Sequence, residues 1–233
     1  MKRRPFVQAC AVAASGAPLP SPSLAAALTA RMYSRAKLVD ARGDPIHAAS
    51  LAAGRNYVFD YPFAATPSFL LRLRDKPAGG IDLKTEAGSI YRWEGGVGPN
   101  RDLVAYSAIC AHKMTYPTRQ VSFIGYRDEP SPAAGRGRVI ACCSDRSVYD
   151  PAAGAKVVSG PAPQPLCTIL LEHDPKTDEL VAVGTFGGEM FAEFFRKYEF
   201  RLQLEQGPRA RNAVEGTAVV RELETYSTQW AKC

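Results

Sequence analysis

The sequence predicts a mainly β protein with a helical segment near its C-terminal end. Of its 233 residues, 46% are hydrophobic and 22% are charged, an ordinary composition for a chain with a packed core. The 19 glycines and 18 prolines favour short strands joined by turns over long helices. No apolar run reaches the ~18 residues that a membrane-spanning helix needs, and Pro18, Pro20 and Pro22 interrupt the one alanine-rich stretch. A helical bundle and a multi-span membrane protein are therefore not expected.

The charge distribution does not favour a nucleic-acid partner. The formal net charge is +6, but Lys2, Arg3 and Arg4 supply three of these positive charges. The remaining basic residues are spread out and form no stripe that could follow a phosphate backbone. We therefore expect no nucleic-acid binding.

Residues 1–30 have the pattern of an export signal. Arg3 and Arg4 are followed two positions later by Phe6 and then by an aliphatic residue, which resembles the twin-arginine signal. A weakly apolar region follows, and small residues near Ala27 offer cleavage positions. The alternative is a disordered basic tail. We expect a periplasmic protein exported by the twin-arginine route, with membrane association only through a partner or an uncleaved leader.

Residues 31–188 alternate short β-prone runs with turn residues. The predicted strands are Lys37–Asp40, Asn56–Tyr61, Ser68–Leu73, Ser89–Trp93, Leu103–Ala108, Arg138–Cys142, Thr168–Glu172 and Leu180–Val183. Many short strands at close spacing indicate a sandwich or a small barrel. The stretch Arg119–Gly137 contains two prolines and two glycines near its end, which predicts a long surface loop.

Residues 189–233 are predicted to form a C-terminal helix and tail. Over Glu189–Gln206, aromatic residues recur at helical spacing with charges between them. The members of this stripe are Met190, Phe191, Phe194, Phe195 and Tyr198. Such a stripe is typical of an amphipathic helix packed by its apolar face on the sheet, and a docking helix for a partner is the alternative. The tail contains a β-prone run at Thr217–Val220.

Cysteine and histidine are scarce, and they gather in two segments that each follow a predicted strand. The first is Cys110-Ala111-His112, and the second runs from Cys142-Cys143-Ser144-Asp145 to Asp150. Two loops at strand ends could together offer Cys110, His112, Cys142 and one further ligand to a metal. A third segment, Gly160–Leu166, is rich in proline and could form a rigid cover over an exposed cofactor.

These three segments, in this order, resemble a Rieske iron–sulfur protein, clearly over about residues 103–172 and more weakly over 37–183. The resemblance implies a Rieske-like antiparallel β-sandwich with a small cluster-binding part. It also implies a [2Fe–2S] cluster in which two cysteines hold one iron and two histidines hold the other, at a potential of roughly −150 to +300 mV.

Carried over position by position, the resemblance assigns roles to individual residues. Cys110 and Cys142 resemble the thiolate ligands, and His112 resembles the first imidazole. The hydroxyls that hydrogen-bond to sulfur fall on Ser147 and Tyr149, and the proline cover loop falls on Gly160, Pro161 and Pro163.

The sequence departs from the family pattern in the second segment. Asp145 stands at the second histidine position, and Arg146 stands at a glycine position. The two cysteines that commonly form a disulfide between the loops fall on Thr115 and Ser144. Three interpretations of Asp145 remain open: it ligates the cluster iron through a carboxylate oxygen, it completes a zinc site with the other three residues, or the site is empty.

The other cysteines and histidines receive structural interpretations. Cys143, Cys167 and Cys233 are left over, and a Cys143–Cys167 disulfide could replace the missing clamp between the loops. His47 near the start and His173 at a turn-like strand end are interpreted as structural or surface residues. Neither is expected to be the fourth ligand.

The resemblance implies an electron-transfer protein or subunit whose partner is a cytochrome or a larger oxidoreductase subunit. The alternative is an interaction or assembly subunit on a degenerate Rieske fold, with docking through the aromatic helix. A ring-hydroxylating oxygenase is excluded, because the chain has only 3 histidines and that class needs a second iron site with two more.

Overall fold

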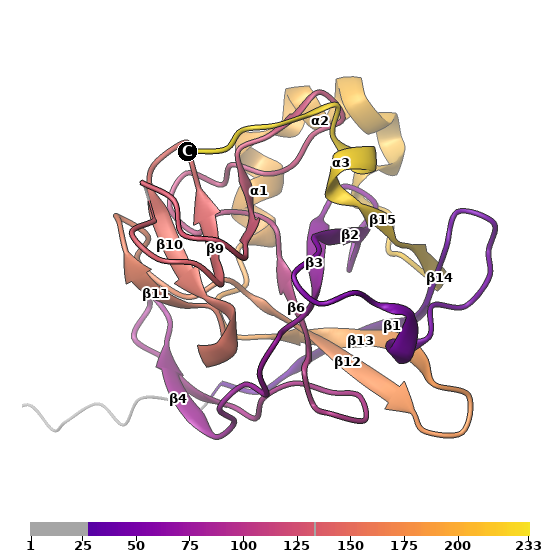
Figure 1. The fold of residues 1–233 in the computed structure, drawn as a ribbon. Helices are drawn as coiled ribbons and strands as arrows, with labels where there is room; N and C mark the ends of the chain where they lie inside the picture. Colours follow the sequence, from indigo (N-terminus) through magenta and orange to yellow (C-terminus); the bar gives the residue numbers. More distant parts are fainter. Residues whose placement is uncertain (1–27, 133) are drawn as a thin grey trace, which may run out of the picture.

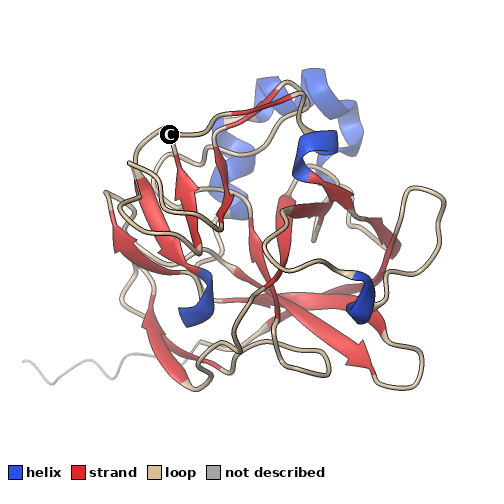
Figure 2. Ribbon diagram, viewed as in Figure 1, coloured by secondary structure: helices blue, strands red, loops and turns tan. Residues whose placement is uncertain are grey.

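The computed structural model describes residues 28–132 and 134–233, so the predicted leader over residues 1–30 lies almost wholly outside the described residues. The described chain forms one large sheet, a smaller sheet and a group of short helices at one end (Figures 1 and 2). The prediction of a mainly β protein with a C-terminal helical extension is therefore confirmed.

The large sheet has eight strands in the order β14-β1-β13-β12-β6-β3-β2-β15. Their bounds are β14 Gly216–Val219, β1 Arg31–Val39, β13 Glu179–Phe186, β12 Thr168–Asp174, β6 Leu103–Ser107, β3 Pro67–Arg72, β2 Tyr57–Asp60 and β15 Arg221–Glu222. Neighbouring strands are antiparallel except β1 and β14, which are parallel. Only Val220 separates β14 from β15, which stand at opposite ends of this order, and β14 contacts β2. The sheet is therefore curled until its ends meet.

The smaller sheet carries the second cysteine segment. Its order is β11-β10-β9-β8, all antiparallel, with bounds β8 Ile124–Arg127, β9 Val139–Cys142, β10 Ser147–Asp150 and β11 Lys156–Ser159. Two ribbons complete the strands: β4 Ile81–Lys84 with β5 Ile90–Trp93, and β7 Val121–Ser122 with β16 Gln229–Trp230. The predicted small part beside the main sheet is thus present.

The apolar alternation of the strands divides the core in two. On one face of the large sheet, Val58, Phe69 and Tyr106 stand in register and pack toward the small sheet. On the other face, Phe59 and Leu70 belong to a second buried cluster. This follows from the period of two along a strand, which sends successive side chains to opposite faces.

The predicted helix Glu189–Gln206 is present as two shorter helices, α1 Phe191–Lys197 and α2 Glu199–Gln206, broken at Tyr198. A third short helix, α3 Leu223–Tyr226, and 3-10 turns at Ala48–Ser50, Pro151–Ala153 and Gly207–Arg211 complete the helices. Among the described residues, no helix is long and apolar enough to span a membrane.

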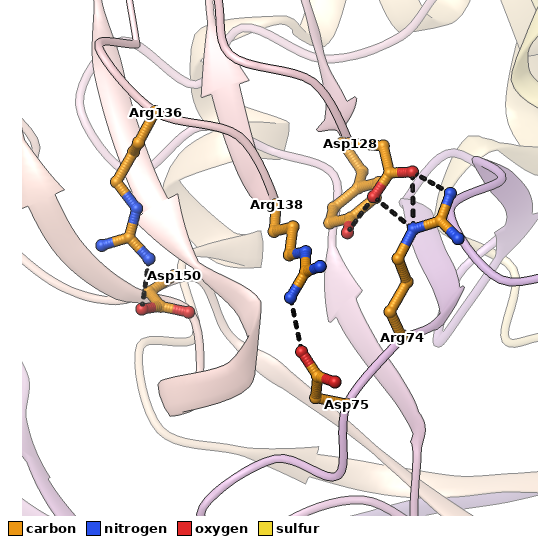
Figure 3. A network of polar contacts seen from close by, with 7 residues as sticks. Arg74, Asp75, Asp128, Arg136, Arg138 and Asp150 are labelled. Carbon is orange, nitrogen blue, oxygen red and sulfur yellow. Dashed lines mark hydrogen bonds and ion pairs between the residues drawn. The ribbon is translucent and has the colours of Figure 1, made fainter.

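The prediction of a surface loop over Arg119–Gly137 is wrong for its first half. That half contains β7 and β8, and all four residues of β8 are buried. Both prolines and two of the three glycines lie after Arg127, so the turn signal applies only to the second half. There, Asp128 binds Arg74, and Arg136 lies 3.2 Å from Asp150, as Figure 3 shows.

Candidate metal centre

The first cysteine segment is a tight turn at the end of β6. The Cys110 backbone N–H donates to the Thr115 carbonyl, and the Met114 N–H donates to the Cys110 carbonyl, both at 2.8 Å. Met114 has a φ of 55°, in the left-handed region that closes such a turn. The turn buries the Cys110 side chain and leaves His112 exposed.

The second segment is the hairpin turn between β9 and β10. Cys142 ends β9 and pairs with Ser147, the first residue of β10. The Arg146 N–H donates to the Cys142 carbonyl at 2.8 Å, and Arg146 has a φ of 62°. Arg146, which stands at the glycine position of the Rieske pattern, therefore adopts a left-handed backbone conformation, which glycine adopts more readily.

The two turns bring four metal-binding side chains together. Cys110 Sγ lies 3.3 Å from Asp145 Oδ2, and His112 Nδ1 lies 3.0 Å from the same oxygen. Single donor atoms of Cys110, Cys142 and Asp145 all lie within 4.8 Å of one another. Two sulfurs, an imidazole nitrogen and a carboxylate oxygen form a donor set that suits iron or zinc.

Two hydroxyls accompany the donors. The Tyr149 hydroxyl lies 3.2 Å from Cys110 Sγ and accepts the Ala111 N–H at 3.1 Å. Ser147 is fully buried, and within the described residues its Oγ makes no hydrogen bond of ordinary geometry. The Asp145 carboxylate lies close to this hydroxyl, which helps to lower the pKa of Asp145. A buried hydroxyl without a partner is costly, so this hydroxyl could donate a hydrogen bond to a group bound at the site.

Hydrogen bonding prepares one thiol and the carboxyl group for ionisation. The hydrogen bond from Cys142 lowers the pKa of Cys110 against the effect of burial, and the Tyr149 hydroxyl acts in the same direction. The same thiol–thiol hydrogen bond, with burial, raises the pKa of Cys142. Burial works to raise the pKa of Asp145, but the Ser147 N–H and the cysteine thiols outweigh it and hold that pKa below its usual value. Metals bind the deprotonated forms, so a lowered pKa at Cys110 and at Asp145 favours metal binding there.

The proline segment begins directly against the second turn. Gly160 has a φ of 89°, and a Cβ at this position would come within 2.4 Å of the Arg146 carbonyl oxygen. Only glycine permits this approach. Pro161 and Pro163 are exposed, and Gln164 fixes the far end of the segment by accepting the Glu86 N–H at 2.9 Å.

The helices α1 and α2 pack on the first turn, which the sequence did not predict. Phe194 is fully buried against Tyr116. Lys197 Nζ and the Tyr198 hydroxyl both donate to the Lys113 carbonyl, at 2.8 and 3.2 Å. The aromatic stripe is thus core, as the sequence favoured, although it packs on the ligand turn rather than on the sheet alone. The alternative of docking through this face is wrong, because the chain itself covers it.

The predicted Cys143–Cys167 disulfide is also wrong. Cys143 is bonded to Cys233, and Cys167 is a buried free cysteine. The C-terminal segment returns to the segment that precedes β8, through the parallel pairing of β16 with β7, which no local pattern indicates. Cys167 instead packs among the side chains under α1.

The two other histidines lie on other parts of the described chain. His47 is exposed, and its Nδ1 lies 3.0 Å from the Thr177 carbonyl oxygen. His173 lies within β12 rather than on a turn, with Nε2 2.7 Å from Asp178. Neither takes part in the group of four donors.

No family model matches the sequence. Among solved structures, the soluble domain of the Rieske protein II (soxF) from Sulfolobus acidocaldarius is similar, with 27% identity and a TM-score of 0.44. The match covers 66% of this chain and 78% of that one. What the site of this chain can bind is therefore judged from its own side chains.

Proposed function

We propose that this chain is a Rieske-type electron-transfer protein that holds a [2Fe–2S] cluster through Cys110, His112, Cys142 and Asp145. Such a cluster, when bound, accepts and releases single electrons. The convergence of two thiols, one imidazole and one carboxylate from two separate turns supports this function.

The two hydroxyls beside the donors, those of Ser147 and Tyr149, favour a cluster over a single zinc ion. Four donors already complete a tetrahedral zinc site, and a zinc ion adds no hydrogen-bond acceptors of its own. A cluster adds sulfide acceptors, and hydrogen bonds to its sulfurs tune its potential. Tyr149 beside Cys110 and the spare donor of Ser147 both fit that need.

Asp145 would stand where the family has its second imidazole. Its side chain is only 1% exposed, and it lies between Cys110 and His112. A carboxylate there adds one negative charge relative to histidine, so we expect a lower potential than two imidazoles would give. Aspartate has no imidazole ring. Proton uptake or release coupled to the change in cluster charge would therefore involve one imidazole ligand instead of two.

Electrons would enter and leave at His112, whose side chain is 33% exposed, whereas Cys110 and Cys142 are fully buried. A redox partner such as a cytochrome or a larger oxidoreductase subunit would dock over this exposed edge. We place the protein in the periplasm, reached by the twin-arginine route.

The test is the iron and acid-labile sulfide content of the purified full chain, with low-temperature EPR of the dithionite-reduced protein. We expect two irons, two sulfides and a mixed nitrogen–sulfur spectrum in the natural protein and in Cys167→Ser, which removes a buried cysteine outside the site. Cys142→Ser should lose both iron and sulfide. One zinc per chain, or a folded protein without metal, would overturn the proposal.

A further inference from the structure

Arg127 is a buried cation to which the described part of the chain offers no counter-ion. The residue ends β8 and is 7% exposed. Among the described residues, no carboxylate forms an ion pair with its guanidinium, and its Nε is buried without a partner. Burial alone lowers the pKa of Arg127, and no nearby charge opposes that effect. A buried charge in this state is costly unless a counter-ion forms.

The Arg127 guanidinium instead lies beside the disulfide. Its Nη2 is 3.1 Å from Cys143 Sγ and 3.9 Å from Cys233 Sγ, and it donates to the Ala231 carbonyl at 2.7 Å. The guanidinium also lies 5.2 Å from the centroid of the Trp230 ring. A disulfide sulfur is a weak acceptor, so this contact compensates little of the charge. A thiolate in the same place would compensate it well.

We propose that the Cys143–Cys233 disulfide is a thiol–disulfide exchange site, in which a small thiol attacks Cys233 and Cys143 is the leaving sulfur. The incoming thiolate bonds to Cys233 Sγ, the Cys143–Cys233 bond breaks, and Cys143 keeps the electron pair beside Arg127. A second thiol then displaces the first from Cys233. Two cysteines are reduced and two equivalents of the thiol are oxidised to their disulfide.

The direction of attack follows from the two sulfur distances. Exchange proceeds faster when the leaving sulfur is the one whose negative charge is better stabilised. Arg127 Nη2 is nearer to Cys143 than to Cys233. Both cysteines are half-buried, and Cys233 follows the exposed Lys232 at the C-terminal end of the chain (Figure 1).

Reduction would remove the covalent bond between the second ligand turn and the C-terminal segment. Cys143 directly follows Cys142, and the segment would then be held by the pairing of β16 with β7 and by hydrogen bonds such as that from Arg127 to Ala231. This consequence rests on the proposed function, since it concerns the turn that would hold the cluster. The exchange itself does not, because it needs no metal.

The first experiment maps the mixed disulfide in the full-length natural protein. The protein is exposed briefly to limiting glutathione, quenched with acid, alkylated, and digested for mass spectrometry. We expect the glutathione adduct on Cys233 and the alkyl group on Cys143. An adduct on Cys143 with Cys233 alkylated would overturn the proposal, as would a disulfide that resists glutathione when folded but reacts when unfolded.

Variants then test the role of the guanidinium. In Arg127→Gln, the rate of reduction by glutathione should fall about tenfold, as expected for loss of a charge-assisted contact. Lys232→Gln removes a cation next to Cys233 that makes no such contact, and its rate should stay within about threefold of the natural rate. Equal rates in the natural protein and Arg127→Gln would contradict the proposal. If Arg127→Gln does not fold, the adduct position in the natural protein still decides.

The iron content separates this inference from the proposed function. A chain that exchanges its disulfide but never holds iron would leave the exchange site standing and remove the cluster. A chain that holds two irons and fails the adduct test would support the cluster and overturn the exchange site.

Discussion

His112 Nδ1 and Asp145 Oδ2 lie 3.0 Å apart, although the two residues come from separate turns 33 positions apart in the sequence. The Asp145 side chain is almost fully buried, and the His112 side chain is one-third exposed. The pair thus joins an inner carboxylate to an outer imidazole at the edge of the molecule. A metal bound by both residues would have one anionic ligand, whereas a pair of imidazoles would supply none.

Replacing Asp145 by histidine tests this charge. Asp145→His should retain the cluster and raise its midpoint potential by on the order of 100 mV, since removing a negative ligand favours the reduced state. The measurement is a redox titration followed by EPR. Asp82→Asn, at an exposed position of β4, is the matched control and should leave the potential unchanged. Identical spectra and potentials for Asp145→His and the natural protein would show that Asp145 is not a ligand.

Tyr149→Phe tests the hydroxyl beside Cys110. The change removes a donor to sulfur and leaves the Ala111 N–H without its acceptor. We expect a loss of about 1–3 kcal/mol in the free energy of unfolding and a lower midpoint potential. Urea titration and redox titration measure the two effects. In Tyr126→Phe, which removes a buried hydroxyl outside the site, the potential should not move.

Asp60 gives the protein a pH-dependent stability. Burial raises the pKa of Asp60 to about 6, although Arg119, Arg221 and the hydrogen bond from Tyr226 oppose it. The folded state therefore binds a proton more tightly than the unfolded state, whose aspartate has a pKa of about 3.9. The contribution of this group to stability is greatest below about pH 4 and is lost as the pH rises through 6.

Asp60→Asn should remove the loss of stability that ionisation of the buried Asp60 causes above about pH 6. Above pH 7, the variant should be more stable than the natural protein by up to about 3 kcal/mol, and the difference should shrink toward pH 4. Urea unfolding at a series of pH values measures it. A constant difference across that range would contradict the raised pKa.

Phe194→Ala tests how far α1 supports the first ligand turn. Phe194 is fully buried, with its ring centroid 5.0 Å from that of Tyr116. Truncation should cost about 3–5 kcal/mol of unfolding free energy and accelerate amide hydrogen exchange in residues 110–116. Phe200→Ala on α2 is the control: Phe200 is 77% exposed, so its truncation should change stability by less than about 0.5 kcal/mol.

The parts of the fold that local pattern controls could be predicted. The strands that contain Phe69, Tyr106 and Ile169 are rich in β-prone residues and are bounded by turn residues. They form where the sequence predicts them. Strands without that composition or with polar ends, such as β10 at Ser147, could not be found, because pairing with β9 rather than propensity stabilises them. The break at Tyr198 was missed for a similar reason, since its hydroxyl bonds to Lys113 on another element.

The candidate site divides in the same way. The spacing of Cys110, His112, Cys142 and Asp145 predicts one site. The structure groups donor atoms of Cys110, Cys142 and Asp145, and His112 lies beside Asp145. The partner of Cys143 and the contact with Arg127 depend on where residues 229–233 return in space. Nothing local in the sequence encodes that return, so the predicted pairing of Cys143 with Cys167, which is nearer in the sequence, is wrong.

The Cys143–Cys233 bond closes a covalent ring across 90 positions of the sequence. The proline segment, β12, β13 and both α1 and α2 lie inside it. A protease that cut the chain near the exposed Leu204 would therefore release no fragment, because each cut end stays attached through the ring. The nicked chain would migrate as one band on a non-reducing gel and as two after reduction. Proteolysis of this half of the molecule thus becomes visible only together with loss of the disulfide.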